Sequence, residues 1–463
     1  MDIIAKHLTM NKAQLFPTTR RPEARKLSTE SQEKIDEWVG NSGINVYKGL
    51  TVGERQEANR LLYTWRDVFE SNLLHIQTTD LIEHGIDLKA DAVPARSKIP
   101  LYTEAELRFV NKLILAMEER GLILRCDSTW LARTKFPPKP NRPGKQEDNF
   151  RMVHNYIPLN WHTLKSQYPC ANIKQIVHTV VKNDKRCFFY TDATDSYWAI
   201  PLCKSDYTLT AFSTPKGQYC YTVMGQGLKG AVHTYARFRD LVFCPIPEDN
   251  RDPGNIRPSY PSLIGDRGER AFDGIMDDSY GSSQDFRSMF DFLHREFFPQ
   301  CVFGPVYLKP VKSFFFFHSL EFVGLEGAGQ GLRPSLQKRN KILDWPTPQS
   351  IEEVNAFCFL TPYLRRFIPE RAELVAIMKK MRDKGTPEEA FYGDQEKENA
   401  FCAIKAAIAY NAMAPPDGSM QYHLAMDASQ RGLGGAIFQL LGVTNLPCAA
   451  RMVGYESCRA VMR

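Results

Sequence analysis

The chain has 463 residues, which at roughly 100–200 residues per domain is too long for one compact core and predicts about three units. Hydrophobic residues make up 43% and charged residues 24%, a balance that excludes a wholly disordered or fibrous chain. The formal net charge of +6 is compatible with a polyanionic partner but does not require one, so composition alone identifies no function.

Cysteine spacing and hydropathy exclude several further classes. The 11 cysteines do not form a disulfide scaffold in a chain of this length, and no two have the C-x2-4-C spacing of a zinc clamp. The first residues have no long hydrophobic stretch, so we predict no secretory signal. The most apolar cluster, Phe314 to Phe317, is far shorter than the roughly 20 residues that span a bilayer. We therefore expect a reduced, intracellular protein with no membrane association.

The first clear element in chain order is an amphipathic helix. Residues 1–72 are polar and weakly periodic, and we expect them to form an N-terminal extension. Thr103 and Glu106 then form a capping-box pattern before a run of helical spacing, and Gly121 is placed to end that helix. Prolines and basic residues at 135–145 predict an irregular basic loop.

Short apolar runs divided by turn residues follow. The predicted strands cover residues 187–191, 208–213, 218–224 and 314–323, with a further strand near Val306. The predicted helices cover residues 230–243 and 284–298, and the proline-rich stretch 244–274 is expected to be a long surface loop. This mixture of short strands and packed helices indicates an α+β core.

The C-terminal part is basic and mainly helical. Residues 333–384 contain eleven basic and six acidic side chains, so most of the net charge lies in this stretch. Pro346 and Pro348 separate two of its helices, and strand character returns from Gln421. A solvated helical surface would explain the charge as well as a binding surface would.

The adjacent acids Asp277 and Asp278 are the first candidates for chemistry. Neighbouring side chains of a strand point to opposite faces, so the two can converge on one site only at a turn or bend. Two vicinal acids in a strand-turn-strand element, joined by a third acid from another strand, form the oxygen cage that Mg²⁺ prefers. Asp192, which follows the strand 187–191, could be the third acid. On spacing alone, a solvated turn is the simpler interpretation.

The segments around these acids resemble, in order, the reverse transcriptases of gypsy-class long-terminal-repeat retrotransposons. FYTDATDSYWAI at 189–200 resembles the first catalytic strand of that family. The other matches are RMVHNY at 151–156, LN at 159–160, TAF at 210–212, GQGLKGA at 225–231, DD at 277–278, FVG at 322–324, WPTP at 345–348, YLRRFI at 363–368 and DAS at 427–429. The matches extend from Leu73 to Gln439, so we identify the chain as resembling this family.

The resemblance implies an α+β right-hand polymerase with fingers, palm and thumb, followed by the start of a ribonuclease H-like α/β domain. The implied domains are an extension at 1–72, fingers and palm at 73–330, a helical thumb and linker at 331–415, and a truncated ribonuclease H-like domain at 416–463. Asp427 matches the first metal-binding acid of that last domain. Since one acid cannot hold two metals, we expect no ribonuclease H activity from this chain alone.

The resemblance also implies the reaction, which is template-directed and primer-dependent transfer of deoxynucleotides by an RNA-directed DNA polymerase. Two Mg²⁺ ions, or Mn²⁺ in their place, would activate the primer 3′-hydroxyl and neutralise the leaving pyrophosphate. Asp192 and Asp277 would bridge these ions and Asp278 would support them. The implied partners are an RNA or DNA template-primer duplex, deoxynucleoside triphosphates and other segments of a Pol polyprotein, in a cytoplasmic particle or the nucleus.

Four matched positions would contact the incoming nucleotide. Arg151 and Lys139 would reach the triphosphate from the fingers, where fixed cations stabilise the transferring group. Tyr197 would lie beneath the sugar and exclude a 2′-hydroxyl, and Gln226 would contact the nucleotide and the template. Without the resemblance, a surface arginine, a core tyrosine and a loop glutamine would be the preferred interpretations.

Five further positions would hold the nucleic acid. Phe322, Val323 and Gly324 would form the strand that holds the primer end. Arg365 and Arg366 would grip duplex phosphates in the thumb, through contacts that are indifferent to base sequence and sensitive to salt.

Several departures from the family pattern lead to an alternative. Ile275 stands where the family has an aromatic residue, Ser196 replaces a glycine, and residues 279–283 read as a poor strand. The alternative function is therefore a catalytically inactive retroelement relic that retains nucleic-acid binding.

Overall fold

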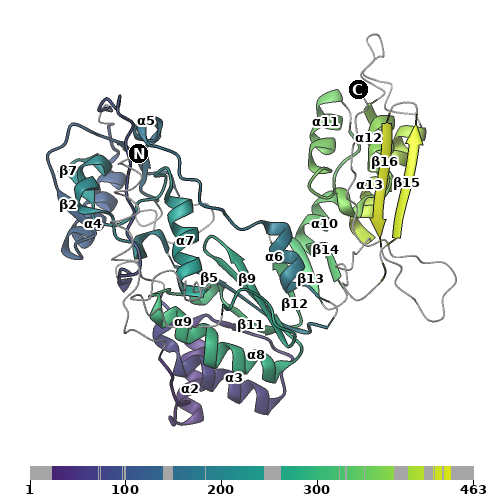
Figure 1. Cartoon of the computed structure of the whole chain (residues 1–463), viewed down its shortest axis with the longest axis horizontal. Helices are drawn as coiled ribbons and strands as arrows, with labels where there is room; N and C mark the ends of the chain where they lie inside the picture. The colour runs from purple at the N-terminus through teal and green to yellow at the C-terminus, as the bar shows by residue number, and fades with distance from the viewer. Residues whose placement is uncertain are drawn as a thin grey trace, which may run out of the picture.

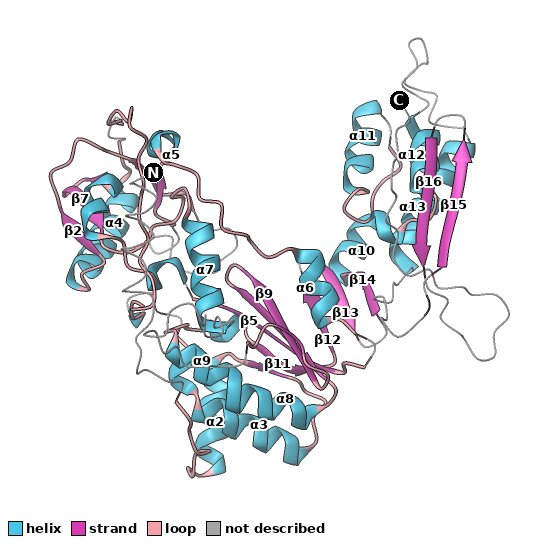
Figure 2. Cartoon of the chain, viewed as in Figure 1, coloured by secondary structure: helices cyan, strands magenta, loops and turns pink. Residues whose placement is uncertain are grey.

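The structure is a computed structural model in which a central group of elements lies between two outlying groups (Figure 1). The described residues are 23–70, 72, 75–95, 97, 101–138, 150–182, 184–194, 196–243, 262–322, 324–328, 331–348, 350–379, 395–410, 421, 423–429 and 432–438. Figure 2 shows the strands of the central sheet between helices, with a second helical group beside the C-terminal hairpin.

A six-stranded sheet forms the centre of the fold. In spatial order its strands are β1 (Asn45–Val46), β11 (Phe314–Phe317), β5 (Cys187–Asp192), β10 (Asp278–Ser283), β9 (Arg270–Ile275) and β8 (Gly265–Asp266). Neighbouring strands are antiparallel except for β1 and β11, which are parallel. The predicted strand at 187–191 is confirmed as β5, so the palm is built around the segment that carries Asp192.

Strand β10 forms despite its serine and glycine content because neighbouring residues pack against its glycine and accept a hydrogen bond from its serine. A Cβ on Gly281 would lie 2.0 Å from Cε1 of Phe189, so the glycine leaves room for that ring. Ser282 is fully buried and its hydroxyl donates a 2.7 Å hydrogen bond to the carbonyl of Val180. Aromatic cover over a strand glycine compensates for the missing side chain.

The two faces of the sheet have different cover. Phe189, Phe272 and Phe315 belong to the cluster that packs against the helical side below the sheet, whereas Phe188 and Tyr280 belong to the cluster shared with the thumb. The helices around the sheet are α2 (Gln32–Ser42), α3 (Val52–Thr64), α6 (Ile173–Val180), α7 (Ala231–Phe243), α8 (Phe286–Phe292) and α9 (Phe298–Phe303). A π-helical turn, Leu293–Phe297, joins α8 to α9.

The N-terminal segment is part of this core. Besides supplying β1, it buries Trp65 completely, and the indole Nε1 donates a 3.0 Å hydrogen bond to Nδ1 of His294 in the π-helical turn. Arg25 stacks on the Trp65 ring at 4.6 Å and pairs with Asp67. The described part of the segment that we expected to be an extension is therefore built into the palm.

The region that we expect to form the fingers contains short strands and two helices. They are α4 (Glu104–Glu119), β2 (Ile123–Arg125), β3 (Arg133–Lys135), β4 (Val153–Asn155), α5 (Ile157–His162), β6 (Phe212–Thr214) and β7 (Gly217–Tyr221). The predicted capping box of α4 is confirmed, because the Thr103 backbone N–H donates to the Glu106 carboxylate at 2.7 Å and the Thr103 hydroxyl accepts from the Glu106 N–H at 3.3 Å. Residues 139–145, which make up most of the predicted basic loop, lie outside the described residues.

A three-stranded sheet leads into the helices that we expect to form the thumb. The strands of the sheet are β12 (Ser319–Phe322), β13 (Leu325–Ala328) and β14 (Gly331–Pro334). The helices are α10 (Leu336–Leu343), α11 (Ile351–Leu360), α12 (Arg371–Lys379) and α13 (Gln395–Tyr410). The C-terminal hairpin consists of β15 (His423–Ser429) and β16 (Gly432–Phe438). The helical character predicted for the basic stretch is confirmed as far as Lys379. None of the helices that the structure describes is long and apolar enough to cross a bilayer.

Three local predictions are wrong. Lys204–Thr210 is a 3-10 helix, so the strand expected at 208–213 is reduced to β6. Val306 lies in a loop. Residues 270–274, expected to belong to the long loop, form β9, because backbone pairing with β10 along their whole length outweighs their charged and glycine-rich composition.

Candidate active site

The three candidate carboxylates lie together at one end of two neighbouring strands. Asp192 ends β5 and stands directly opposite Asp278, the first residue of β10. Asp277 occupies the turn between β9 and β10, and its carbonyl accepts a 2.8 Å hydrogen bond from the N–H of Ala193. Met276, the other turn residue, has φ of +48°, a conformation that is costly for a side chain of this type. The turn therefore brings two adjacent acids to the end of the strand that carries the third.

The facing pair, Asp192 and Asp278, is held by two different partners. Nζ of Lys312 lies 2.9 Å from Oδ1 of Asp192, and the Tyr190 hydroxyl donates a 2.6 Å hydrogen bond to Oδ1 of Asp278. Burial raises the pKa of Asp278 above its usual range, the hydrogen bond from Tyr190 opposes that shift, and the negative charge of Asp192 adds to it. The pair thus concentrates negative charge at the strand ends.

Asp277 is contacted from a 3-10 helix, Ser196–Ala199. Oγ of Ser196 donates a 2.5 Å hydrogen bond to Oδ1 of Asp277. The next residue, Tyr197, is half-buried with its ring centroid 5.6 Å from that of Tyr235 on α7. Burial, with the nearby charge of Asp277, raises the pKa of Tyr197 to about 12. Tyr197 therefore stays neutral beside the carboxylates.

The donor set is of the kind that binds a hard divalent cation, since three carboxylates at adjoining strand ends supply only oxygen ligands. Within the described ranges, no group of three acidic, histidine or cysteine side chains surrounds one point closely enough to hold an ion. Each of the three acids is contacted by one neighbouring side chain, from Lys312, Ser196 or Tyr190. The three acids are therefore the candidate ligands for such a cation.

Two of the four predicted nucleotide contacts lie on exposed segments of the fingers. Arg151 is exposed immediately before β4, and Gln226 is exposed in the loop between β7 and α7. Gly227 follows with φ of +88°, and its carbonyl accepts a 2.8 Å hydrogen bond from Nδ2 of Asn160 on α5. Lys139 lies outside the described residues. The loop carrying Gln226 is thus anchored to the same finger segment that follows Arg151.

Two of the predicted primer-holding residues, Phe322 and Gly324, lie where the chain turns from β12 into β13. Phe322 is 1% exposed and its ring centroid is 4.6 Å from that of Tyr280, so its side chain faces the core. Gly324 has φ of +79°, and the aliphatic stem of Lys338 fills the space beside it. Val323 lies outside the described residues. This turn can therefore offer backbone, rather than the Phe322 side chain, to a ligand.

The predicted duplex-gripping residues stand on a 3-10 helix of the thumb, Arg365–Phe367. Arg365 is exposed, and Phe367 anchors the turn because it is buried. The side chain of Arg366 is outside the described set, as is that of Asp427, which lies on β15. Beside this turn, Nζ of Lys338 lies 4.2 Å from the ring centroid of Tyr363, so cation and aromatic ring share one surface.

Lys312 is a site residue that sequence reasoning missed. It ends a short 3-10 helix, Pro310–Lys312, and reaches Asp192 across 120 positions of sequence. Its only sequence signal is a lysine directly before the apolar run of β11. Such a residue reads as an ordinary boundary charge, and only the fold brings it to the acid.

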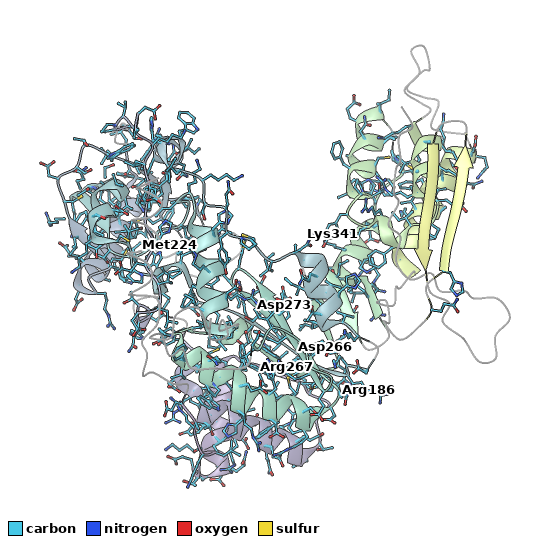
Figure 3. The ribbon with its side chains drawn as sticks, viewed as in Figure 1. Arg186, Met224, Asp266, Arg267, Asp273 and Lys341 are labelled. Atoms are coloured by element: carbon cyan, nitrogen blue, oxygen red, sulfur yellow. The ribbon has the colours of Figure 1, made fainter. Side chains whose placement is uncertain are left out.

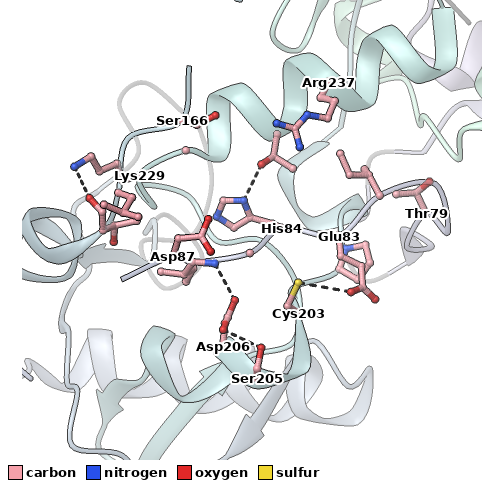
Figure 4. Close-up of a pocket in the computed structure, with 18 of the residues that line it drawn as sticks. Thr79, Glu83, His84, Asp87, Ser166, Cys203, Ser205, Asp206, Lys229 and Arg237 are labelled. Carbon is pink, nitrogen blue, oxygen red and sulfur yellow. Dashed lines mark hydrogen bonds between the residues drawn. The ribbon is translucent and has the colours of Figure 1, made fainter. Parts of the chain in front are cut away.

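A cavity of about 550 Å³ is lined by the segments around His84, Thr163, Asp206 and Thr234, and none of the three candidate acids lines it (Figure 4). His84 is 2% exposed at its centre, with Nδ1 2.8 Å from the hydroxyl of Thr234. Burial lowers the pKa of His84 to about 4, so the ring is neutral near pH 7. Asp206 caps the N–H of Ile86 at 2.8 Å. The cavity is therefore separate from the carboxylates.

Comparison with known sequences finds a family match in the central region. Residues 138–260 match the family described as Reverse transcriptase (RNA-dependent DNA polymerase). The chain is 25% identical over 384 residues to the retrovirus-related Pol polyprotein from transposon 412 of Drosophila melanogaster. The aligned region covers 83% of this chain and 29% of that protein. The chain is 26% identical over 365 residues to the corresponding polyprotein from transposon 297 of the same organism, covering 78% and 32%. The chain spans about a third of the length of these relatives.

Comparison with solved structures agrees in fold. A foamy viral protease-reverse transcriptase in complex with dsDNA superposes with a TM-score of 0.70 at 15% identity, covering 95% of this chain and 82% of that one. The same enzyme in complex with an RNA/DNA hybrid gives 0.67 at 15% identity, covering 96% and 54%. The expected α+β polymerase fold is confirmed.

Proposed function

Because the chain contains a reverse transcriptase region related to retrotransposon Pol polyproteins, we propose that it is an RNA-directed DNA polymerase. The observation that carries the proposal is the register of β5 with β10, which sets Asp192 opposite Asp278 and puts Asp277 at the adjoining turn. Carboxylates at adjoining strand ends can hold the divalent cations that promote phosphoryl transfer.

The reaction forms a bond between the primer O3′ and the α-phosphorus of a deoxynucleoside triphosphate and breaks the bond from that phosphorus to the bridging oxygen. The leaving group is pyrophosphate, and the hydroxyl proton passes to solvent. Two divalent cations, Mg²⁺ or Mn²⁺, would stabilise the charge on the attacking and leaving oxygens. Asp192 and Asp277 would hold them, with Asp278 in support.

The remaining roles belong to residues of the fingers and palm. Arg151, with Lys139, would neutralise the triphosphate. The half-buried neutral ring of Tyr197 would pack against the sugar, where a 2′-hydroxyl would meet it, and Gln226 would orient the nucleotide. Lys312, paired with Asp192 at 2.9 Å, adds a mobile cation beside the reacting phosphates.

The nucleic acid would lie between palm and thumb as a template-primer duplex. The foamy viral enzyme is in complex with dsDNA in one structure and with an RNA/DNA hybrid in another, which supports the same partner class here. Phe322, Val323 and Gly324 would hold the primer end through backbone, and Arg365 and Arg366 would contact phosphates. Other segments of a Pol polyprotein are the further partners that we propose.

Primer extension on an RNA template tests the proposal. We expect the 463-residue chain to extend an annealed DNA primer in Mg²⁺, and Asp277→Asn to lose measurable extension while keeping its thermal stability. Asp291→Asn, an acid of α8 that pairs with surface arginines, is the matched control and should extend normally. If folded protein extends no primer in Mg²⁺ or Mn²⁺ yet binds duplex in a salt-sensitive manner, the inactive relic replaces the polymerase.

A further inference from the structure

Beneath the carboxylate turn lies a buried ion pair that the reaction does not use. Arg239 on α7 is 5% exposed and Asp273 on β9 is 6% exposed. Nη2 of Arg239 lies 3.5 Å from Oδ1 of Asp273, and Nη1 donates a hydrogen bond to the carbonyl of Gly274. The same Oδ1 accepts a 2.7 Å hydrogen bond from the N–H of Gly274. Figure 3 labels Asp273 at the sheet beneath α7.

Burial of the two charges of this pair costs free energy. Moving two charges into a protein interior costs several kcal/mol per ion, and an apolar pair of similar volume is often as stable or more stable. Burial raises the pKa of Asp273, in agreement with that cost. Stability alone therefore does not explain why a guanidinium and a carboxylate occupy this place.

The location of the pair supplies the explanation. Gly274 faces Ser279 in the register of β9 with β10, two residues before Met276 begins the turn. A Cβ on Gly274 would lie 2.3 Å from the carbonyl oxygen of Asp278 and 2.9 Å from Nη2 of Arg239. The guanidinium therefore contacts the backbone at the base of the turn that carries both acids.

Helix α7 also contacts the other side of the site. Tyr235 stands four residues before Arg239, so both side chains lie on one face of the helix. Tyr235 packs against Tyr197, whose neighbour Ser196 is bonded to Asp277. One helix face therefore touches the base of the acid turn and the segment that contacts its carboxylate.

We propose that Arg239 and Asp273 are positioning residues, which fix the turn bearing Asp277 and Asp278 relative to Asp192 so that the acids can bind a divalent cation. This inference rests on the proposed function. The guanidinium suits the task because its planar fork donates to the Asp273 carboxylate and the Gly274 carbonyl at once, which the single ammonium of lysine does not reproduce.

The test measures Mn²⁺ binding to the full chain by electron paramagnetic resonance, which needs no turnover. In the double variant Arg239→Met with Asp273→Val, we expect thermal stability close to that of the wild type, because an apolar pair replaces the ions. Its Mn²⁺ affinity should fall about tenfold, the scale of loss when groups that orient metal ligands are removed. Arg239→Lys should lower the Mn²⁺ affinity by a similar factor, because lysine keeps the positive charge but lacks the planar set of donors of the guanidinium.

A matched control exists in the same strand. Arg270 is 6% exposed and pairs with Glu296 at 2.6 Å, at the end of β9 far from the acids. Arg270→Met with Glu296→Leu should leave Mn²⁺ affinity unchanged, whatever its effect on stability. If the Arg239→Met with Asp273→Val variant binds Mn²⁺ as tightly as the wild type, the inference is overturned. The pair would then have a structural role only.

The same measurement separates this inference from the polymerase proposal. If the wild type binds Mn²⁺ more tightly than Asp277→Asn but extends no primer, the polymerase proposal fails and the positioning role stands. If the wild type binds Mn²⁺ no better than Asp277→Asn, the positioning role is overturned. In an active enzyme, the double variant should lower kcat while the KM for the nucleotide changes less than about twofold, because the lost interaction acts on the metal ligands.

Discussion

Ser196 donates a 2.5 Å hydrogen bond from Oγ to Oδ1 of Asp277. The serine is 4% exposed and stands where the family resemblance implies glycine, so its hydroxyl is a donor that a glycine would lack. A hydrogen bond to a charged group contributes about 1.5–3 kcal/mol, enough to fix one rotamer of the acid.

Replacing Ser196 by alanine should therefore weaken catalysis without unfolding the palm. We expect kcat for primer extension to fall about tenfold, since each ~1.4 kcal/mol of lost orientation is a factor of ten in rate. The thermal midpoint should change by only a few degrees. Steady-state extension with titrated nucleotide checks this, and an unchanged kcat would contradict a role for the hydroxyl.

Gly281→Ala tests the packing that allows β10 to form. The new methyl group would lie 2.0 Å from Cε1 of Phe189, so the ring must leave its place in the core. We expect the free energy of unfolding to fall by about 2–3 kcal/mol, the usual cost of overpacking. Gly53→Ala is the matched control, because nothing lies within 4 Å of its added Cβ on helix α3, and it should stabilise by roughly 0.5–1 kcal/mol. Denaturant unfolding measures both.

His84 predicts a pH dependence of stability. Its folded pKa of about 4 lies below the ordinary 6.5, so between those values the unfolded chain binds more protons. Stability contributed by neutral His84 is therefore present above pH 6.5 and is lost as the pH falls toward 4, by roughly 2 kcal/mol at pH 5. His84→Asn should flatten this slope. Urea unfolding at pH 7 and pH 5 compares the slopes.

Arg365→Ala should reduce duplex binding in a way that is independent of sequence. Loss of one phosphate contact lowers the slope of log affinity against log salt by about one, equally for all template sequences. Arg287→Ala, which removes an exposed arginine of α8, should not change the slope. Fluorescence anisotropy over a salt series measures this, and equal slopes for the two variants would exclude Arg365 from the interface.

Elements specified by nearby residues could be predicted from the sequence. The capping box at Thr103 and Glu106 and the apolar run of β5 are local signals, and both are confirmed. Strand β9 could not be predicted, because its charged residues look like surface side chains until the fold supplies their partners. Asp273 and Arg239 are separated by 34 positions, and Arg270 and Glu296 by 26.

The residues of the candidate site likewise include some that the sequence indicates and one that it does not. The motif order was sufficient to select Asp192, Asp277 and Asp278, and the structure brings the three to one strand end. Their catalytic roles stay predictions. Lys312 could not be found from the sequence, because no local pattern relates a lysine to an acid 120 positions away. Residue types that carry chemistry leave a signal, and the groups that hold them in place do not.

The parallel pairing of β1 with β11 has a consequence for how the palm is made. Asn45 pairs with Phe314, so the first and last strands of the central sheet to be synthesised lie side by side. During translation the sheet stays incomplete until the ribosome has passed residue 317. A fragment that starts after β1 would leave the phenylalanine-rich β11 as an uncovered edge strand, which is a template for aggregation. Soluble expression of the palm therefore requires the N-terminal segment.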